Sequence, residues 1–461
     1  MEWNERAWAE QVFGRCELGD RRRTARLVRY AAQQAKDASA STHTVCLGDE
    51  TAAEGAYRLL RNAQVAPAAV AEGGFCHTGE VAQGHGALLA VEDSTTLGFP
   101  HAVARALGDI GGPAQSQRRG WVVHSVLLVD RETGRTVGLL EQQRWRRDAA
   151  TRGKYRARKA RPYEQKESYK WQQASERIAE RLGETMARVI SVCDREADIY
   201  EYLTYKRHRQ ERFIVRAAWD RHLHDSGERL WAHLAQQPPC GTVRLSIPQR
   251  GGRQARVAHL TLRSGPVLFH SPQRAGGRLA PLEVQAVYAV EEQAPPGTTP
   301  LEWVLLTSEP VATFLEAHQV LEAYRLRWRV EEFHKAWKLG CGIEERRLQT
   351  PENLERLAVI LAFVAVRLLQ LREGVEAVPD QPCDTILQRP QWECLWLSTE
   401  SPPLPTTVPS TQWAYYALAK LGGWSDTKRT GRVGWLTLWR GWQRLADRAH
   451  GYALAQRLRG P

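Results

Sequence analysis

The chain has 461 residues and a formal net charge of +12, from 64 Lys and Arg against 52 Asp and Glu. Hydrophobic residues make up 43% and charged residues 25%, which is typical of a globular protein with several domains. The sequence has neither a run of about eighteen apolar residues nor the apolar core of a signal peptide, so it predicts a cytoplasmic protein without a membrane span. The positive charge favours a polyanionic partner such as a nucleic acid.

The eight cysteines are scattered, and none forms a Cys-x2-Cys pair or stands beside histidines at the spacing of a zinc site. A disulfide framework is not expected in a chain of this length. We therefore expect reduced thiols that are mostly buried.

Residues 1–70 read as helices and are expected to form an N-terminal DNA-binding domain. Asp20 can cap the helix that follows it. The first turns of that helix hold four cations, which oppose the helix dipole and favour an external anion. They are Arg21, Arg22, Arg23 and Arg26. A solvated basic face is the alternative. A second helix carries Arg58 and Arg61.

The next part of the chain alternates between strands and helices. Residues 87–99 are an apolar run with carboxylates near its end, which predicts a buried strand. Residues 121–130 and 136–145 predict a β-hairpin, 189–198 a strand ending in an Asp, and 212–219 a further strand. The basic stretch 144–170 predicts a loop, either one that contacts nucleic acid or one that is merely solvated.

Residues from about 220 to 310 lose the helical period and predict an inserted β-rich block. Residues 316–340 predict one long helix that ends at a glycine, and 351–373 a core helix. Seven of the 23 prolines fall between 375 and 410, so 374–410 reads as a linker before a helical region at 411–461. An apolar face in that last region predicts either a dimer contact or packing on its own domain. The tryptophans of this apolar face are Trp435, Trp439 and Trp442.

This order of elements predicts an α/β fold with an RNase H-like core in residues 71–373, an inserted β-rich subdomain, and flanking helical domains. Strand ends place Asp93 and Asp194 at one edge of the sheet, where α/β folds bind ligands. Glu92 is expected on the opposite sheet face from Asp93. Asp198 is expected to pair with an arginine, although a minor metal role stays open. The histidines 124 and 334 are expected to be packed or hydrogen-bonded rather than metal ligands.

The predicted long helix supplies a third carboxylate, Glu331. With Tyr324, Arg327 and Lys338 it lies at offsets of 0, 3, 7 and 14, which span about 60° of a helix. Three carboxylates suit two Mg²⁺ ions, and two such ions serve in-line displacement at phosphorus. The neighbouring cations are suited to holding phosphate oxygens.

The helix YRLRWRVEEFHKAWK carries the Tyr-x2-Arg-x3-Glu-x6-Lys signature of DDE transposases of the insertion-sequence-four group. VEDSTTL and VCDREADIY resemble the first and second Asp motifs of that family. Further similarity lies in LGDRRRTARLV, EGAYRLLRN, RGWVVHSVLL, LEWVLLTSEP and SDTKRTG, so the resemblance spans nearly the whole chain. It is poorest in 374–410, where few of the family's basic residues occur.

This resemblance implies that Asp93, Asp194 and Glu331 are the catalytic residues and hold two Mg²⁺ ions, with Mn²⁺ able to substitute. It implies double-stranded DNA as partner, both transposon ends and target, and a homodimer in the synaptic complex at the bacterial nucleoid. The residues 411–461 would mediate dimerisation. The implied DNA contacts are Arg26, Arg58, Arg216, Trp303, Tyr324, Arg327, Trp328 and Lys338.

In the implied reaction the enzyme nicks the transposon end, the freed 3′-hydroxyl closes a hairpin on the opposite strand, water reopens it, and the 3′ end attacks target DNA. Trp303 would stack on a base flipped out of the helix. Its alternation with Leu301 and Leu305 leaves a core tryptophan as the alternative. Two other functions stay open: a plain nuclease of RNase H fold, and an inactive relative that only binds ends.

Overall fold

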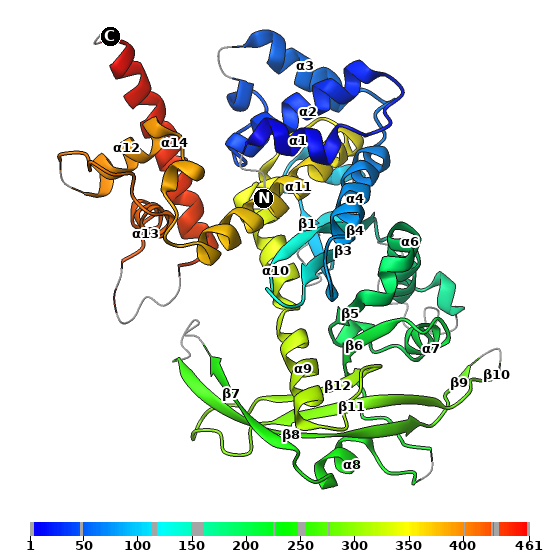
Figure 1. Ribbon diagram of the computed structural model, residues 1–461. Helices are drawn as coiled ribbons and strands as arrows, with labels where there is room; N and C mark the ends of the chain where they lie inside the picture. The colour runs from blue at the N-terminus through cyan, green and yellow to red at the C-terminus, as the bar shows by residue number, and fades with distance from the viewer. Residues whose placement is uncertain are drawn as a thin grey trace.

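The computed structural model describes residues 4–46, 49–111, 118–148, 161–224, 226–247, 255–274, 277–400, 402–425, 427 and 433–458. A long mixed sheet runs through the molecule, with helices of both chain ends gathered at one end and a block of long strands at the other (Figure 1). Within these ranges, no helix has the length and apolarity needed to cross a membrane. Residues 149–160, the middle of the predicted basic stretch 144–170, lie outside the described part.

Five strands form the centre of the sheet in the order β4-β3-β1-β5-β6. They are β1 (Leu88–Gly98), β3 (Arg119–Asp130), β4 (Thr136–Trp145), β5 (Val189–Cys193) and β6 (Arg212–Arg216). The strands β1, β5 and β6 are parallel, and β3 is antiparallel to β1 and β4. The two-residue strand β2 (Gly108–Asp109) pairs with β3. This is the predicted RNase H-like arrangement.

The start of β1 is apolar on both faces because both faces of the sheet are covered. Leu89 and Val91 join one core, and Leu88 and Ala90 join another. The first core lies under α4 (Pro67–Ala82), α10 (Trp328–Lys335) and α11 (Pro351–Ala377). The other face is covered by α6 (Lys170–Leu182) and α7 (Tyr200–His208).

The strand predicted over 87–99 is confirmed, but the prediction that Asp93 lies at a strand end is wrong. The strand β3 is long enough to pair with β1 along its whole length, from Leu88 to Gly98, so β1 continues past the aspartate. The parallel pairing with β5 stops earlier, at Val91 opposite Val192. Asp93 therefore lies just beyond the paired part of β5, on a stretch of β1 that only β3 supports.

The predicted β-rich insertion extends the same sheet. Its strands are β7 (Gly241–Ile247), β8 (Arg256–Phe269), β11 (Leu282–Val290) and β12 (Glu302–Thr307), with the helix α8 (Leu230–Gln236) before them. They continue in the order β6-β12-β11-β8-β7, and β12 is antiparallel to β6. The insertion thus places its last strand directly beside the strand that carries Arg216.

The helix predicted over 316–340 is broken into three parts. They are α9 (Phe314–Arg325), α10 and a π-helical turn, Ala336–Gly340. The junction between α9 and α10 contacts the turn between β3 and β4, where Arg329 Nε donates to the carbonyl of Gly134 at 3.2 Å. This contact is between distant parts of the sequence, so the helical period alone could not predict it.

The N-terminal helices α1 (Glu5–Phe13), α2 (Arg21–Lys36) and α3 (Glu50–Arg61) confirm the helical prediction. Asp20 caps α2 as expected, by accepting from the backbone N–H of Arg22. These helices share a core with α11, and the rings of Phe13 and Phe363 meet edge to face at 5.5 Å.

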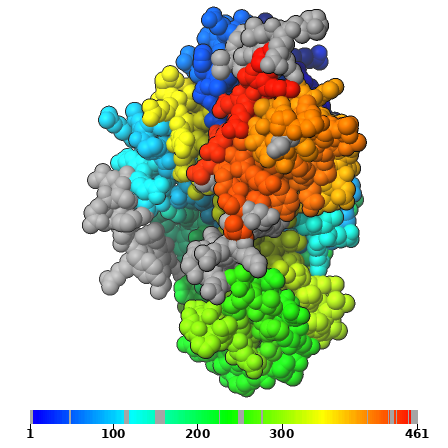
Figure 2. Space-filling model, turned by 90° about the vertical axis from the view of Figure 1, so that its left-hand side faces the viewer, coloured from blue at the N-terminus to red at the C-terminus, as the bar shows by residue number. Residues whose placement is uncertain are grey.

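The C-terminal region differs from the prediction in two ways. A helix, α12 (Arg389–Thr399), lies inside the predicted linker, and Trp392 and Leu395 pack with α13 (Thr411–Leu421) and α14 (Trp435–Leu458), so the linker prediction is wrong for these residues. Trp439 is 7% exposed and belongs to the main core, with Trp442 packed against it. The side chain of Trp435 lies outside the described part. The described tryptophans therefore pack within the chain. In Figure 2 the C-terminal helices form the face turned to the viewer, above the strands of the insertion.

Candidate active site

Two aspartates lie side by side where the parallel strands β1 and β5 diverge. Since Val91 is in register with Val192, Asp93 lies beside Asp194, the first residue after β5. Burial raises the pKa of Asp93 to about 7, and the nearby charges of Asp194 and Glu331 add to that shift. Burial also raises the pKa of Asp194. The fold thus holds two carboxylates together at a cost that a cation would relieve.

Arg327, at the break before α10, and Glu331, one turn later, both lie near Asp93. Arg327 Nη2 donates to Glu331 Oε1 at 2.7 Å, and its Nη1 lies 3.9 Å from Asp93 Oδ2. The guanidinium is buried, yet its Nε and Nη1 have no hydrogen-bond partner among the described residues. Buried donors are rarely left unpaired, and a phosphate oxygen would satisfy them.

Lys338 reaches the same site from the π-helical turn. Its Nζ donates to Thr95 Oγ1 at 2.7 Å, two residues along β1 from Asp93. Burial lowers the pKa of Lys338. Lys338 thus lies near Asp93, as predicted, although it is in a π-helical turn rather than in the same α-helix as Glu331. Its contact with Thr95 was not indicated by the sequence.

An aromatic and cationic rim lies beside the carboxylates. The ring of Tyr324 lies 6.0 Å from the guanidinium of Arg327 and 5.9 Å from the ring of Trp303. Arg216 donates to the carbonyl of Glu302 at 3.1 Å, next to Trp303 in β12. Trp303 is partly buried: it packs against the main core and keeps part of its surface exposed.

The remaining predicted contacts lie elsewhere. Trp328 is 47% exposed and packs on Arg327 at 5.6 Å. Arg26 and Arg58 lie exposed on α2 and α3, at the N-terminal end of the molecule. Arg58 forms an exposed ion pair with Glu54, at 2.8 Å.

Other acidic and histidine residues near the motifs have structural partners, as predicted. Asp198 pairs with Arg221 at 2.5 Å and accepts from the backbone N–H groups of residues 218 and 219, so it is not available as a ligand. Glu92 is fully buried and bonds His124, on the face away from Asp93. His334 is buried and bonds Ser125.

The residues present fit a divalent cation by their chemistry. Oxygen ligands are what Mg²⁺ prefers, and the raised pKa of Asp93 reflects negative charge gathered in a buried place. Glu331 is turned towards Arg327, and accordingly no cluster of three His, Cys, Asp or Glu side chains in the described ranges is tight enough to hold a metal as it stands.

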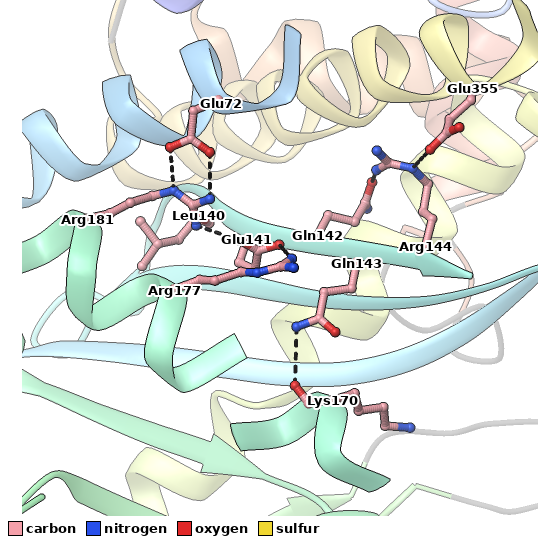
Figure 3. Close-up of polar contacts among 10 residues, drawn as sticks. All are labelled: Glu72, Leu140, Glu141, Gln142, Gln143, Arg144, Lys170, Arg177, Arg181 and Glu355. Atoms are coloured by element: carbon pink, nitrogen blue, oxygen red, sulfur yellow. Dashed lines mark hydrogen bonds and ion pairs between the residues drawn. The ribbon is translucent and has the colours of Figure 1, made fainter. Parts of the chain in front are cut away.

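A concave surface lies along β4, between α4 and α6, and several of its arginines are already paired with carboxylates (Figure 3). Arg181 pairs with Glu72 at 2.6 Å and with Glu141 at 2.5 Å, and Arg144 pairs with Glu355 at 3.1 Å. Because carboxylates occupy these guanidinium groups, this surface offers less to a phosphate than the unpaired donors of Arg327 do.

Comparison with known protein families identifies the chain. The transposase DDE domain matches residues 114–367, which is over half of the 461 residues. The chain belongs to the DDE transposases. A second family, transposase DNA-binding, matches residues 5–65 and so covers α1 to α3. Asp194 and Glu331 lie inside the match to the DDE domain, whereas Asp93 precedes it.

This membership makes the chain a DNA-binding transposase, in a class of enzymes that cleave DNA and transfer strands and that typically use divalent metal ions. Among solved structures, a cryo-EM structure of the piggyBac transposase synaptic complex with hairpin DNA is similar at 10% identity. The match covers 82% of this chain and 76% of that chain, with a TM-score of 0.39, which is too low to support any inference about the site.

Proposed function

We propose that this DDE transposase works by cut-and-paste, and that it belongs to the insertion-sequence-four group, where it most resembles the transposase of transposon five. It binds transposon ends, nicks them, forms and reopens a DNA hairpin, and joins the 3′ ends to target DNA. One observation carries the proposal. The unpaired donors of Arg327 lie beside Asp93 and Glu331, in the signature that this group shares.

In this proposal Asp93, Asp194 and Glu331 hold two Mg²⁺ ions, for which Mn²⁺ substitutes. When bound, such ions activate the attacking oxygen and stabilise charge at the phosphate. Binding requires Glu331 to turn from Arg327 towards the aspartates, and that turn frees a third donor of Arg327 for phosphate.

The surrounding side chains position the DNA. Arg327 and Lys338 hold the phosphate at the cleaved bond, with Tyr324 and Arg216 beside them. In each step an oxygen of water or of a 3′-hydroxyl attacks phosphorus, and the DNA oxygen on the far side of that phosphorus leaves. No covalent enzyme intermediate is therefore needed.

Recognition of the ends is assigned to residues 1–70, with Arg26 and Arg58 facing the duplex. Pairing of two ends by a homodimer is assigned to residues 411–461, as the family resemblance implies. The burial of Trp439 removes the reason that the sequence suggested for this assignment, so the dimer contact must use another surface of these helices.

The decisive experiment incubates the protein with Mg²⁺ and linear DNA that carries the candidate ends, and separates the products on a denaturing gel. A transposase of this type produces a nick and then a hairpin, whereas a plain nuclease produces only nicked or degraded strands. An inactive relative shifts the DNA on a native gel without cutting it. Absence of the hairpin from a protein that nicks would overturn the cut-and-paste assignment.

Trp303→Ala separates the two enzymatic functions further. Stacking of a base on an aromatic ring is worth about 1–3 kcal/mol, so hairpin closure should slow by roughly ten- to a hundredfold while the first nick is nearly unchanged. Trp303→Phe, which keeps a ring, should restore part of the rate. If nicking and closure fall together, or if the melting temperature drops, Trp303 is a core residue and the base-flipping role is lost.

A further inference from the structure

His334 lies one helical turn after Glu331 and is the buried neighbour of Asp93. Its Nδ1 is 3.9 Å from Asp93 Oδ2, and its Nε2 is 3.2 Å from Ser125 Oγ. A neutral imidazole carries a proton on only one of its two nitrogens, and the other nitrogen is then an acceptor.

A chain of hydrogen bonds behind the active site decides which nitrogen that is. Arg144 can only donate, and its Nη1 lies 2.8 Å from Gln142 Oε1. The amide of Gln142 therefore turns its Nε2 towards Ser125 and donates to Oγ at 3.1 Å. Among the described residues, Nε2 of His334 is the one acceptor within reach of the buried Ser125 hydroxyl, and buried hydroxyl protons are normally donated. Nε2 therefore accepts from Ser125, the ring is neutral, and its proton is on Nδ1.

We propose that three side chains fix the tautomer of His334 so that its Nδ1–H faces Asp93. They are Arg144, Gln142 and Ser125, none of which contacts DNA in the proposed function. They are positioning residues. The proposal takes one point from the proposed function, namely that Asp93 binds a cation.

The tautomer determines whether the Nδ1 atom of His334 presents a partial positive or a partial negative charge to the carboxylate of Asp93. A ring N–H attracts Asp93 Oδ2 and holds it in one orientation, whereas a ring nitrogen lone pair would repel it. Groups that orient a metal-binding side chain in this way typically matter by 10- to 100-fold in metal affinity or activity.

The chain is anchored outside the active site. Arg144 Nε donates to Glu355 Oε1 of α11 at 3.1 Å, so the first donor is held by an ion pair between β4 and α11 (Figure 3). Ser125 is fully buried, and Gln142 is 5% exposed. Solvent therefore offers these groups no competing hydrogen bonds.

Gln142→Glu reverses the chain without changing its shape. The introduced carboxylate accepts from Arg144 and from the hydroxyl of Ser125, whose proton is then used. Ser125 must accept from Nε2–H of His334, and Nδ1 presents its lone pair to Asp93. Gln143→Glu is the matched control. It adds the same charge one residue further along β4, where Gln143 faces α6 and donates to the carbonyl of Lys170.

The tautomer is measured by ¹⁵N NMR of histidine-labelled full-length protein, with His334→Gln to assign the signal. We expect Nδ1–H in the wild type and in Gln143→Glu, and Nε2–H in Gln142→Glu. Mn²⁺ titration without DNA, followed by broadening of the His334 signal, should need roughly tenfold more cation in Gln142→Glu. Nicking should fall by a similar factor, with end binding and melting temperature unchanged.

Three results would overturn the inference: Nε2–H in the wild type, no reversal in Gln142→Glu, or a reversal that leaves the Mn²⁺ midpoint unchanged. A wild-type protein that binds Mn²⁺ but cleaves no end DNA would instead defeat the proposed function. The NMR and titration results would still decide the role of the hydrogen-bond chain.

Discussion

Glu92 and Asp93 are neighbours in β1 and lie on opposite faces of the sheet, and each has a histidine beside its carboxylate. Glu92 Oε2 lies 3.2 Å from His124 Nε2, both side chains have no exposed surface, and the ring of Trp171 covers the histidine at 4.5 Å. Asp93 lies 3.9 Å from His334 and keeps 19% of its side chain exposed. The residue types are almost the same, so access from outside, rather than composition, distinguishes this sealed pair from the pair in the proposed site.

The largest expected difference between the two faces is in DNA cleavage. Asp93→Asn removes a cation ligand in the proposed site and should reduce nicking to background, as should Asp194→Asn and Glu331→Gln. End binding should persist in all three, since affinity comes from cations such as Arg26. The measurement is nicking of labelled end DNA on a denaturing gel, with a native gel for binding.

Glu92→Gln is the matched control on the other face. It makes the same kind of change one residue away and should keep nicking within about tenfold of the wild type, or about 1.4 kcal/mol. Loss of nicking in a folded Glu92→Gln protein would mean that the sealed pair also contributes to the reaction. Wild-type nicking by Asp93→Asn would remove Asp93 from the site.

The second expected difference is in folding stability. His124→Ala leaves the buried carboxylate of Glu92 without its hydrogen-bond partner and opens a cavity beside Trp171. The free energy of unfolding should fall by about 2–4 kcal/mol, measured by urea denaturation. His85→Ala is the comparison, because His85 pairs with Asp130 at 2.9 Å but is 33% exposed, and its loss should cost at most about 1 kcal/mol. Equal losses would show that burial does not separate the two pairs.

The smallest effect concerns the dependence of stability on pH. The pKa of Asp93 is raised from 3.8 to about 7, so the folded protein binds the proton more tightly than the unfolded chain does. Stability therefore falls as the pH rises between these values, and it stays lower above about 7. Without divalent cations, Asp93→Asn should have a higher melting temperature than the wild type at pH 8 and little advantage at pH 4.

Adding Mg²⁺ at pH 8 should raise the melting temperature of the wild type and reduce that advantage. An advantage of equal size at both pH values would contradict the assigned shift. No response of the wild type to Mg²⁺ would count against a cation beside Asp93.

Much of the fold could be predicted because it follows from local patterns. The turn after Asp130, the apolar runs of β1 and β5, and the cap at Asp20 each depend on residues close in sequence. The linker prediction failed because prolines do not prevent a helix when they lie in its first turn, as Pro390 does in α12. The apolar face around Trp439 was visible in the sequence, but its partner surface was not.

The sequence by itself determined which residue types this transposase brings to its site, because strand and helix periods assign side chains to faces before any tertiary contact forms. Only the tertiary structure decided which of them lie together. The extension of β1 along β3, and the break of the helix against Gly134, put Arg327 beside Asp93 and leave its donors unpaired. The chain of hydrogen bonds from Arg144 to His334 likewise connects β4, β3 and α10. Such contacts depend on backbone positions far apart in the chain, which no local pattern specifies.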